Sequence, residues 1–273
     1  MALDVSPARG GSRVALVTGG CSGIGKAIAH RLAVRGHPLL LVSERADRLR
    51  SVAAELRTAH GIDVQVLCLD LARPGAAEAL YQRVGALGLE VDILVNNAGV
   101  FFFGEAADAP TDRASAMLQL QVVTPSLLCT LFGREMRERR RGWILIVSSI
   151  SAWRDFPGIA YYGSSKKYLR GFARAVRCEM GVYGVHVTCL APGPTATSLY
   201  GTDADTVRRG RRLGFFLETN RVAEAGLQAL FAGRGECVPG VANRIMAAAA
   251  GLTPQWVVDL LRRRAKWLKA PLP

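Results

Sequence analysis

The sequence is poor in the residue patterns that hold metals or build disulfide frameworks. Its 273 residues include 4 histidines and 6 cysteines. The histidines are isolated, no two cysteines have the C-x-x-C spacing of a zinc site, and most cysteines fall inside apolar runs. We therefore expect no bound metal. Buried thiols in a reducing compartment are expected instead, which predicts a cytoplasmic protein.

Long hydrophobic runs are also missing. No uninterrupted apolar stretch reaches the roughly 18 residues of a membrane span, and the first residues contain no apolar signal-peptide segment. We expect residues 1–12 to form a flexible N-terminal lead-in. The rest of the chain is long enough to bury one sizeable core, and nothing in it demands a second domain.

Acidic residues are few relative to basic ones. The chain has 35 Lys and Arg against 22 Asp and Glu, a net charge of +13, and much of it lies in residues 137–141, 208–212 and 262–269. Such an excess suits nucleic acid or an anionic membrane. The aromatic and basic residues do not interleave as in an RNA-binding sheet, so we expect a basic surface and no nucleic-acid partner.

Glycine, in contrast, is concentrated near the N-terminus in the sequence Thr-Gly-Gly-Cys-Ser-Gly-Ile-Gly, from Thr18 to Gly25. The apolar run Val14–Val17 before it predicts a buried strand, and Lys26–Ala33 after it predicts a helix. Glycines let the backbone come close to a ligand, and a helix N-terminus offers free N–H groups and a positive dipole end. This pattern predicts a site for the pyrophosphate of a dinucleotide.

A second motif lies near the middle of the chain. Tyr162 and Lys166 are four residues apart and share one face of a helix. There the ammonium can lower the pKa of the phenol from its ordinary ~10 towards neutrality, so that the phenol exchanges a proton with a carbonyl or alcohol oxygen. Ser149, upstream, strengthens the motif. The neighbouring residues are weaker candidates for these roles. Tyr161, the alternative phenol, has no lysine four residues on, and Ser148, the alternative hydroxyl, would face the other side of a strand.

Apolar runs and helical patterns alternate along the chain. Strands are expected at Val14–Val17, Pro38–Ser43, Val64–Asp70, Asp92–Asn96, Trp143–Ser148 and His186–Ala191. Helices are expected at Ile24–Arg35, Ala46–His60, Gly75–Ala86, Asp112–Arg140 and Tyr162–Tyr183. The alternation predicts an α/β fold over residues 13–241, a single doubly wound Rossmann-type parallel sheet with helices on both faces.

Two regions fall outside this alternation. Residues 195–217 predict a lid over a bound substrate. Residues 242–273 predict a basic amphipathic C-terminal helical tail, with one apolar face formed by Val257, Leu260, Leu261, Ala265 and Leu268. This tail either packs on its own core or on a partner subunit, or it makes peripheral contact with an anionic membrane surface.

With these motifs in this order, the sequence resembles the short-chain dehydrogenase/reductase family from about Ser12 to Gly240. The resemblance implies a catalytic set of Ser149, Tyr162, Lys166 and the helix residue Gln121. It also implies a cofactor site made of Thr18, Gly19, Ser22, Gly23, Ile24, Gly25, Ser43, Arg45, Asp70, Leu71, Asn97, Ala98, Gly99, Tyr162, Lys166, Pro192, Gly193 and Thr195.

The family resemblance implies an NAD(P)(H)-dependent oxidoreductase that interconverts a carbonyl compound and its alcohol. Tyr162 would be the acid/base, Lys166 would lower its pKa and hold the nicotinamide ribose, and Ser149 would donate a hydrogen bond to the substrate oxygen. The family also implies a homo-dimer or homo-tetramer. The alternative is a dinucleotide-binding regulatory or scaffold protein with little turnover.

One position departs from the family pattern. Members usually carry an asparagine in the long fourth helix, where it helps to hold a water that relays protons to the lysine, and this chain has Gln121. Glutamine keeps the amide and adds a methylene, so the substitution is either tolerated with a shifted water or weakens the relay. We expect Gln121→Asn to keep or raise turnover.

The residues after the second expected strand, Ser43-Glu44-Arg45, bear on cofactor choice. NAD-preferring relatives usually have aspartate at the Ser43 position, and NADP-preferring relatives usually have arginine at the Glu44 position. Ser43 leaves room for a phosphate that Arg45 or Arg48 can reach, whereas Glu44 would repel it or accept a ribose hydrogen bond. We expect NADP(H) to be favoured slightly over NAD(H).

Aromatic residues flank the catalytic motif. They are Phe101, Phe102, Phe103, Trp153, Phe156, Tyr161, Tyr200, Phe215 and Phe216. An apolar wall around a serine and a tyrosine suits a small hydrophobic ketone, aldehyde or alcohol. We expect Ser149, Trp153, Tyr161 and Tyr200 to contact this substrate.

Overall fold

The computed structural model describes residues 13–195 and 216–264. The expected lead-in, most of the expected lid with Tyr200 and Phe215, and the last nine residues of the tail lie outside these ranges. The two ends of the lid segment are described: Thr195 and Leu217 form an isolated parallel β-bridge, so the chain leaves and re-enters the described domain at one place.

One parallel sheet of seven strands forms the centre of the molecule, in the order β3-β2-β1-β4-β5-β6-β7. The strands are β1 (Arg13–Thr18), β2 (Leu39–Ser43), β3 (Val64–Cys68), β4 (Glu90–Asn96), β5 (Gly142–Val147), β6 (Val185–Leu190) and β7 (Glu236–Cys237). The predicted fold class is confirmed. The sequence indicated the first six strands, but β7 has two residues, too few to show a period.

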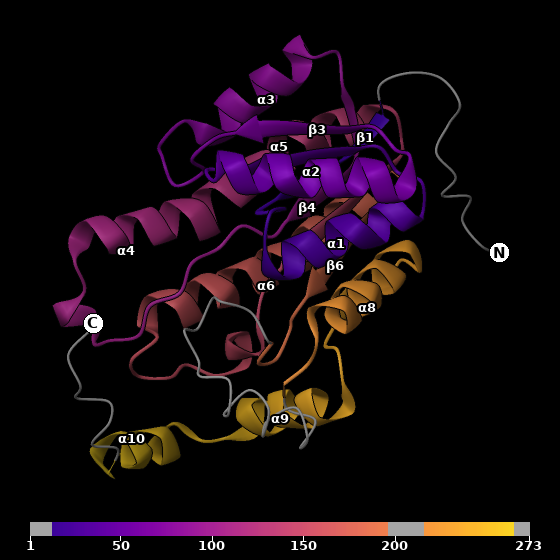
Figure 1. The fold of residues 1–273 in the computed structure, drawn as a ribbon. Helices are drawn as coiled ribbons and strands as arrows, with labels where there is room; N and C mark the ends of the chain where they lie inside the picture. The colour runs from indigo at the N-terminus through magenta and orange to yellow at the C-terminus, as the bar shows by residue number, and fades with distance from the viewer. Residues whose placement is uncertain (1–12, 196–215, 265–273) are drawn as a thin grey trace.

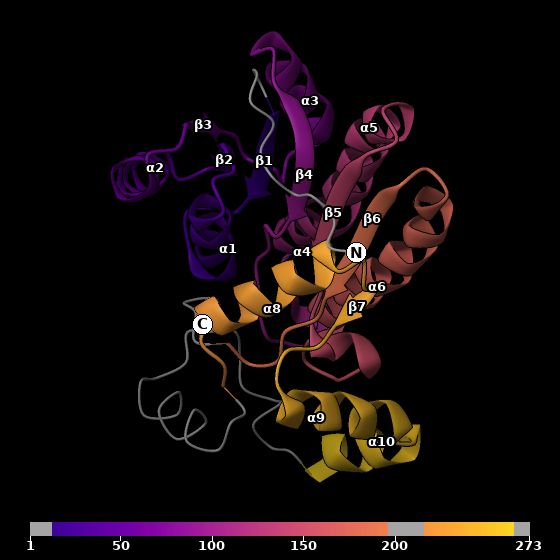
Figure 2. The ribbon, with the colours of Figure 1, turned by 90° about the vertical axis from the view of Figure 1, so that its right-hand side faces the viewer.

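Helices cover both faces of the sheet (Figures 1 and 2). One face carries α1 (Gly23–Val34), α2 (Ala46–His60) and α8 (Thr219–Phe231). The other carries α3 (Ala76–Ala86), α5 (Thr124–Glu138) and α6 (Ala160–Gly181). Successive strand residues alternate between these layers: Val17 and Leu41 pack under α1 and α2, whereas Leu16 and Leu40 pack under the other layer. Both faces are apolar, as in buried parallel sheets.

The long helix expected at Asp112–Arg140 is interrupted. It consists of α4 (Thr111–Leu118), a π-helical turn η2 (Gln119–Val123) and α5. By length and composition alone, the segment Thr111–Glu138 is able to cross a membrane. A core helix passes the same test, and here Leu128, Phe132 and Met136 are buried in the core beneath α5. The π turn places Gln121 towards the catalytic helix, as described below.

The tail differs in detail from the prediction. It folds into α9 (Val241–Leu252) and α10 (Gln255–Arg264), which lie together at one end of the molecule (Figures 1 and 2). Among the described side chains of α10, Val258 is buried, Val257 is half-buried and Leu260 is exposed. The exposure of Leu260 fits an apolar face that the domain does not cover, and the expected face, most of which lies outside the described side chains, stays a prediction.

The thiols also differ in part from expectation. Cys21, Cys129 and Cys189 are buried, but Cys68 and Cys178 are exposed. Burial raises the pKa of Cys129 and of Cys189 to about 12, so both are neutral near pH 7.

Candidate active site

A buried threonine joins the ends of the two central strands. Thr18, the last residue of β1, donates its hydroxyl to the carbonyl oxygen of Val95 at 3.1 Å and accepts from the backbone N–H groups of Asn97 and Ala98. The Asn97 amide in turn donates to the carbonyl oxygen of Thr18 at 2.9 Å. These bonds hold the loop after β4 against the glycine-rich turn.

Only glycine fits the tightest points of that turn. Gly19 and Gly23 have left-handed φ angles of 66° and 53°. A Cβ on Gly25 would lie 2.3 Å from the carbonyl oxygen of Gly19. The first turn of α1 carries no acidic residue, and its N-cap Ser22 makes no side-chain capping bond. The N-terminal N–H groups of α1 are thus open to an anion, and this cradle fits a dinucleotide pyrophosphate.

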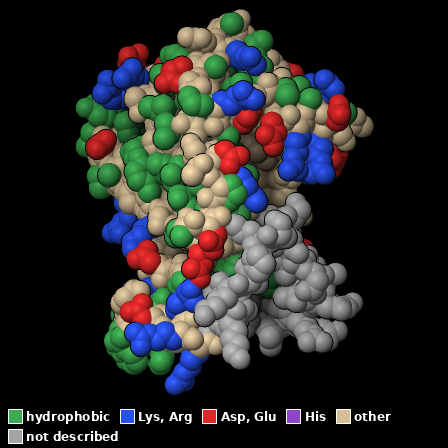
Figure 3. Space-filling model, turned by 90° about the vertical axis from the view of Figure 1, so that its left-hand side faces the viewer, with side chains coloured by type: hydrophobic (Ala, Val, Ile, Leu, Met, Phe, Trp, Pro, Cys, Tyr) green, Lys and Arg blue, Asp and Glu red, His purple; other side chains and the backbone are tan. Residues whose placement is uncertain are grey.

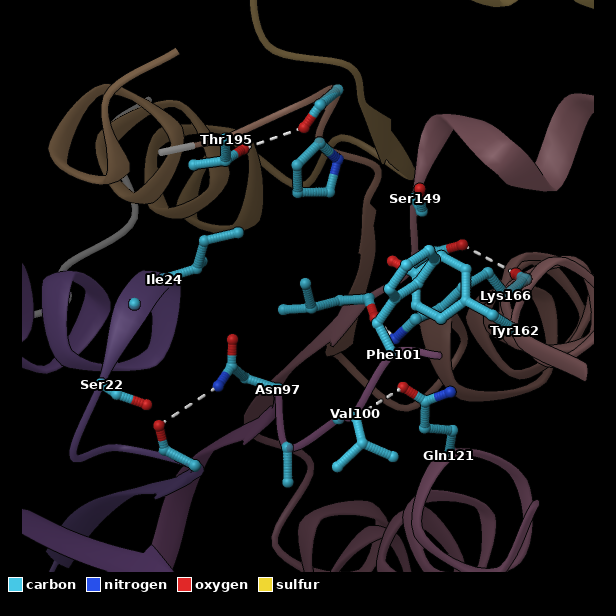
Figure 4. Close-up of a pocket in the computed structure, with 18 of the residues that line it drawn as sticks. Ser22, Ile24, Asn97, Val100, Phe101, Gln121, Ser149, Tyr162, Lys166 and Thr195 are labelled. Carbon is cyan, nitrogen blue, oxygen red and sulfur yellow. Dashed lines mark hydrogen bonds between the residues drawn. The ribbon is translucent and has the colours of Figure 1, made fainter. Parts of the chain in front are cut away.

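A cavity of about 290 Å³ connects this turn with the catalytic motif. Figure 4 shows Ser22 and Ile24 on one side of it and Ser149, Tyr162 and Lys166 on the other. A second cavity of about 520 Å³ shares Gly19, Ser22 and Arg45 with the first. Together they make one elongated site along the carboxyl ends of the strands, as expected for a dinucleotide.

The second cavity contains the residues expected at the adenosine end. Asp70 and Leu71 line it, and the Asp70 carboxylate accepts from the backbone N–H of Ala72 at 2.9 Å. Ser43 lines it too, and its Oγ accepts from the backbone N–H of Arg45 at 3.3 Å. Arg113 of α4 is an additional cation on this wall, and nothing in the sequence marked it out.

At the opposite end, Pro192, Gly193 and Thr195 line the first cavity. Thr195 donates its hydroxyl to the carbonyl oxygen of Gly193 at 2.9 Å. Asn243 of α9, fully buried, presses on the same segment, since a Cβ on Gly193 would lie 2.3 Å from its Oδ1. Asn243 is a supporting residue that sequence reasoning did not assign to the site, although an asparagine within an alanine-rich helix was a signal.

The lysine of the Tyr162–Lys166 pair is deeply buried. Lys166 is 4% exposed, and its Nζ donates to the carbonyl oxygen of Val147, at the end of β5, at 3.1 Å. Burial lowers the pKa of Lys166 to about 8, because the charged form loses its hydration. The ammonium lies 5.6 Å from the centre of the Tyr162 ring. The two side chains expected to act as a pair therefore meet in one cavity.

The two neighbouring serines have different partners. Ser148 donates its hydroxyl to the carbonyl oxygen of Lys166 at 2.7 Å and so helps to fix the catalytic helix. The Oγ of Ser149 accepts from the backbone N–H of Ser151 at 3.2 Å, which leaves its hydroxyl proton available to another acceptor. Ser149 rather than Ser148 is thus free to donate to a ligand in the cavity.

Gln121 bridges the loop after β4 and the catalytic helix. Its Oε1 accepts from the backbone N–H of Val100 at 3.1 Å, and its Nε2 donates to the Oγ of Ser165 at 3.0 Å. Ser165 in turn donates to the carbonyl oxygen of Tyr162 at 2.7 Å. Gln121 makes these bonds from within the π-helical turn, which helical periodicity did not indicate.

Two of the residues expected to contact substrate, Tyr161 and Trp153, pack against other side chains. The Tyr161 ring lies 6.0 Å from the Phe102 ring, and Trp153 lies under the guanidinium of Arg170 at 3.8 Å. Among the described residues neither lines the two cavities above. Phe101 does, and its ring meets Tyr162 edge-on at 5.0 Å (Figure 4). In the described part of the chain, no group of three or more His, Cys, Asp or Glu residues is arranged to hold a metal ion.

Comparison with known proteins decides the family. Residues 13–207 match the family model described as short chain dehydrogenase. The chain belongs to the short-chain dehydrogenase/reductase family. It is therefore an NAD(P)-dependent oxidoreductase by family, and the expectation drawn from its motifs is confirmed.

Two curated members of this family are similar to the chain over about two thirds of its length. The chain is 36% identical over 188 residues to dehydrogenase/reductase SDR family member 4 of Bos taurus, covering 68% of this chain and 67% of the relative. It is 32% identical over 192 residues to inactive hydroxysteroid dehydrogenase-like protein 1 of Homo sapiens, covering 68% and 57%.

Two solved structures are similar over almost the whole chain. A 7beta-hydroxysteroid dehydrogenase is 25% identical with a TM-score of 0.82, covering 92% of this chain and 96% of that protein. A short-chain dehydrogenase from Sphingobium yanoikuyae, solved in complex with NADPH, is 25% identical with a TM-score of 0.76, covering 95% and 98%.

The lowered pKa of Lys166 predicts a pH-dependent stability. Below pH 8 Lys166 is charged in the folded protein, and the buried ammonium destabilises the fold. Between pH 8 and the ordinary pKa of 10.5, the folded protein releases this proton while the unfolded chain still holds it. Raising the pH through this window therefore removes a penalty. Relative to Lys166→Met, the native protein should gain about 2 kcal/mol in unfolding free energy between pH 7 and about pH 9.5 in urea titrations.

The adjacent lysine provides the control. Lys167 is exposed and paired with Asp155, so the native protein should show no such gain relative to Lys167→Met. Equal pH dependence for the two variants would contradict the assignment of a buried, weakened ammonium to Lys166.

The bridge made by Gln121 predicts a split between stability and turnover. Asparagine is one methylene shorter and can reach only one of the two partners, so Gln121→Asn should lower the unfolding free energy by about 1 kcal/mol. Turnover should stay within tenfold of the native rate or rise. Steady-state kinetics and urea unfolding on the same samples would check both, and a larger loss of turnover would show that the glutamine itself is needed.

Proposed function

We propose that this enzyme interconverts a small hydrophobic ketone or aldehyde and its alcohol, with NADP(H) favoured over NAD(H). The observation that carries the proposal is the single cavity in which Ser149, Tyr162 and Lys166 face the glycine-rich cradle. The bound dinucleotide supplies or accepts the hydride. The protein's own residues then have to orient the substrate oxygen and handle one proton.

The Tyr162 hydroxyl is the proton donor in the reductive direction and the acceptor in the oxidative direction. The Lys166 ammonium favours the phenolate that forms when this proton leaves, since a positive charge nearby stabilises a developing negative one. Ser149 donates a hydrogen bond to the same substrate oxygen and stabilises charge that builds there. Ser165 and Gln121 position the helix that carries the tyrosine.

An apolar substrate suits the walls near Tyr162. Phe101, Phe102 and Met117 form an apolar cluster with the tyrosine ring. A structurally similar protein is a 7beta-hydroxysteroid dehydrogenase, which supports a hydrophobic alcohol or ketone as the substrate class here. Trp153, Tyr161 and Tyr200 remain proposed substrate contacts.

NADP(H) preference is proposed from charge. Arg45 lines both cavities, and the backbone turn around Ser43 leaves the small hydroxyl where an NAD-type acid would stand. An arginine binds a phosphate with charge-assisted hydrogen bonds. The NADPH complex of a similar dehydrogenase supports this preference.

The alternative is a dinucleotide-binding scaffold with little turnover, and one relative is named as inactive. The intact set of Ser149, Tyr162 and Lys166 favours catalysis, because a scaffold needs neither a buried lysine nor a tyrosine beside it.

We further propose a cytoplasmic homo-dimer or homo-tetramer.

Removal of one hydroxyl tests the catalytic proposal. Tyr162→Phe keeps the ring contact with Phe101 but removes the proton donor, so turnover of a panel of hydrophobic ketones should fall at least about 100-fold. NADPH affinity, measured by fluorescence titration, should stay within about threefold. Tyr161→Phe is the matched control and should keep most activity. Similar turnover for native protein and Tyr162→Phe would sink the proposed acid/base role.

Neutralising one arginine tests the cofactor proposal. Arg45→Gln should raise the Michaelis constant for NADPH about tenfold, since it removes a charge-assisted bond to the 2′-phosphate, and should leave that for NADH unchanged. Arg50→Gln, a change at an exposed arginine paired with Asp47 on the same helix, should alter neither. A native enzyme that prefers NADH tenfold would overturn the proposed preference.

A further inference from the structure

Helix α9 presents an apolar stripe to the outside. Val241, Ile245 and Leu252 lie on one side of the helix and are 67%, 64% and 84% exposed. Trp256, in the first turn of α10, is 66% exposed. The opposite side of α9 is the one that packs on the domain, where Asn243 and Ala247 are buried. The exposed stripe is therefore not a face that the described fold covers.

The segment that carries this stripe is rich in basic residues. From residue 241 to the C-terminus the sequence has six cations and one acid, Asp259. Of the described cations, Arg262 is paired with Glu105, whereas Arg244, Arg263 and Arg264 are exposed. Figure 3 shows hydrophobic side chains next to Lys and Arg side chains at this end of the molecule. We call Val241, Arg244, Ile245, Leu252, Trp256, Arg263 and Arg264 the tail face.

We infer that the tail face docks on an anionic lipid surface. Apolar side chains and a tryptophan enter the interfacial region of a bilayer, while the adjacent arginines meet the acidic headgroups. A second copy of the chain is a poorer occupant. A two-fold symmetric contact through this face would gather the arginines of both copies in one interface, with one acid in each tail to offset them.

The helices that carry the tail face pack, with their other side, beside the catalytic cavity. Helix α9 packs on the short helix η3 (Ile150–Trp153), which follows Ser149 directly. Helix α10 is tied by Arg262 to Glu105, in the loop that carries Phe101. Docking would thus leave one helix diameter, ~10 Å, between the site and the lipid in which a hydrophobic carbonyl compound dissolves. This last consequence rests on the proposed function, but the docking itself does not.

Vesicle co-sedimentation of the full chain tests the inference. Binding to phosphatidylcholine vesicles with about 30% phosphatidylserine should exceed binding to pure phosphatidylcholine vesicles at least tenfold at about 0.1 M salt, and should fall at about 0.5 M salt. The fluorescence of Trp256 should shift to shorter wavelength on binding, and this part of the shift should vanish in Trp256→Ser.

Paired variants distinguish vesicle binding through the tail face from non-specific adsorption of the protein. Leu252→Ser with Trp256→Ser, and Arg263→Gln with Arg264→Gln, should each reduce vesicle binding at least tenfold. Val34→Ser with Val182→Ser, which changes two apolar residues elsewhere that are 61% and 70% exposed, should reduce it less than twofold. Turnover of a water-soluble ketone should be unchanged in all three, so a failure of docking is distinguishable from a failure of the proposed chemistry.

Two results would overturn the inference. One is native protein that stays in the supernatant with acidic vesicles. The other is a loss of oligomeric state in the tail-face variants, measured by light scattering, which would assign the face to contact between copies of the chain.

Discussion

The burial of one positive charge is the constraint on which the site depends. Lys166 leaves water to lie under the end of β5, held by the carbonyl oxygen of Val147, and its pKa falls to about 8. A burial of this kind is costly to the fold, so it persists where function requires a charge in that position. The side chains nearby serve the same end: Ser148 holds the lysine backbone, and Gln121 with Ser165 holds that of Tyr162.

The parallel sheet explains why such distant residues meet. The glycine-rich turn follows β1, the Asn97 loop follows β4, Ser149 follows β5 and Pro192 follows β6, all at the carboxyl edge. Thr18 and Asn97 fasten the two central strand ends to each other, so the cradle for the pyrophosphate is set by the sheet itself. Helix α6 completes the site with Tyr162 and Lys166, which lie on one face of the helix.

Much of this arrangement was predictable, and the reasons for the exceptions are physical. The sequence alone indicates Gly19, Gly25 and the Tyr162–Lys166 spacing, because few other residue types fit these positions or provide this chemistry. The bridge made by Gln121 depends on a π-helical turn, and the face that α10 buries depends on where Val258 meets the domain. Trp153 lies under the guanidinium of Arg170, a contact that the sequence does not indicate, and its expected contact with substrate stays a prediction.

The most direct test of the central claim follows an isotope. The enzyme should be given NADPH deuterated at C4 of the nicotinamide, in each of its two stereochemical forms, with a hydrophobic ketone that it turns over. We expect deuterium on the carbinol carbon of the product from one form only, and no label at that carbon when the solvent is D2O. Product without deuterium from either form, or with label taken from solvent at that carbon, would contradict a site that joins direct hydride transfer to a proton from Tyr162.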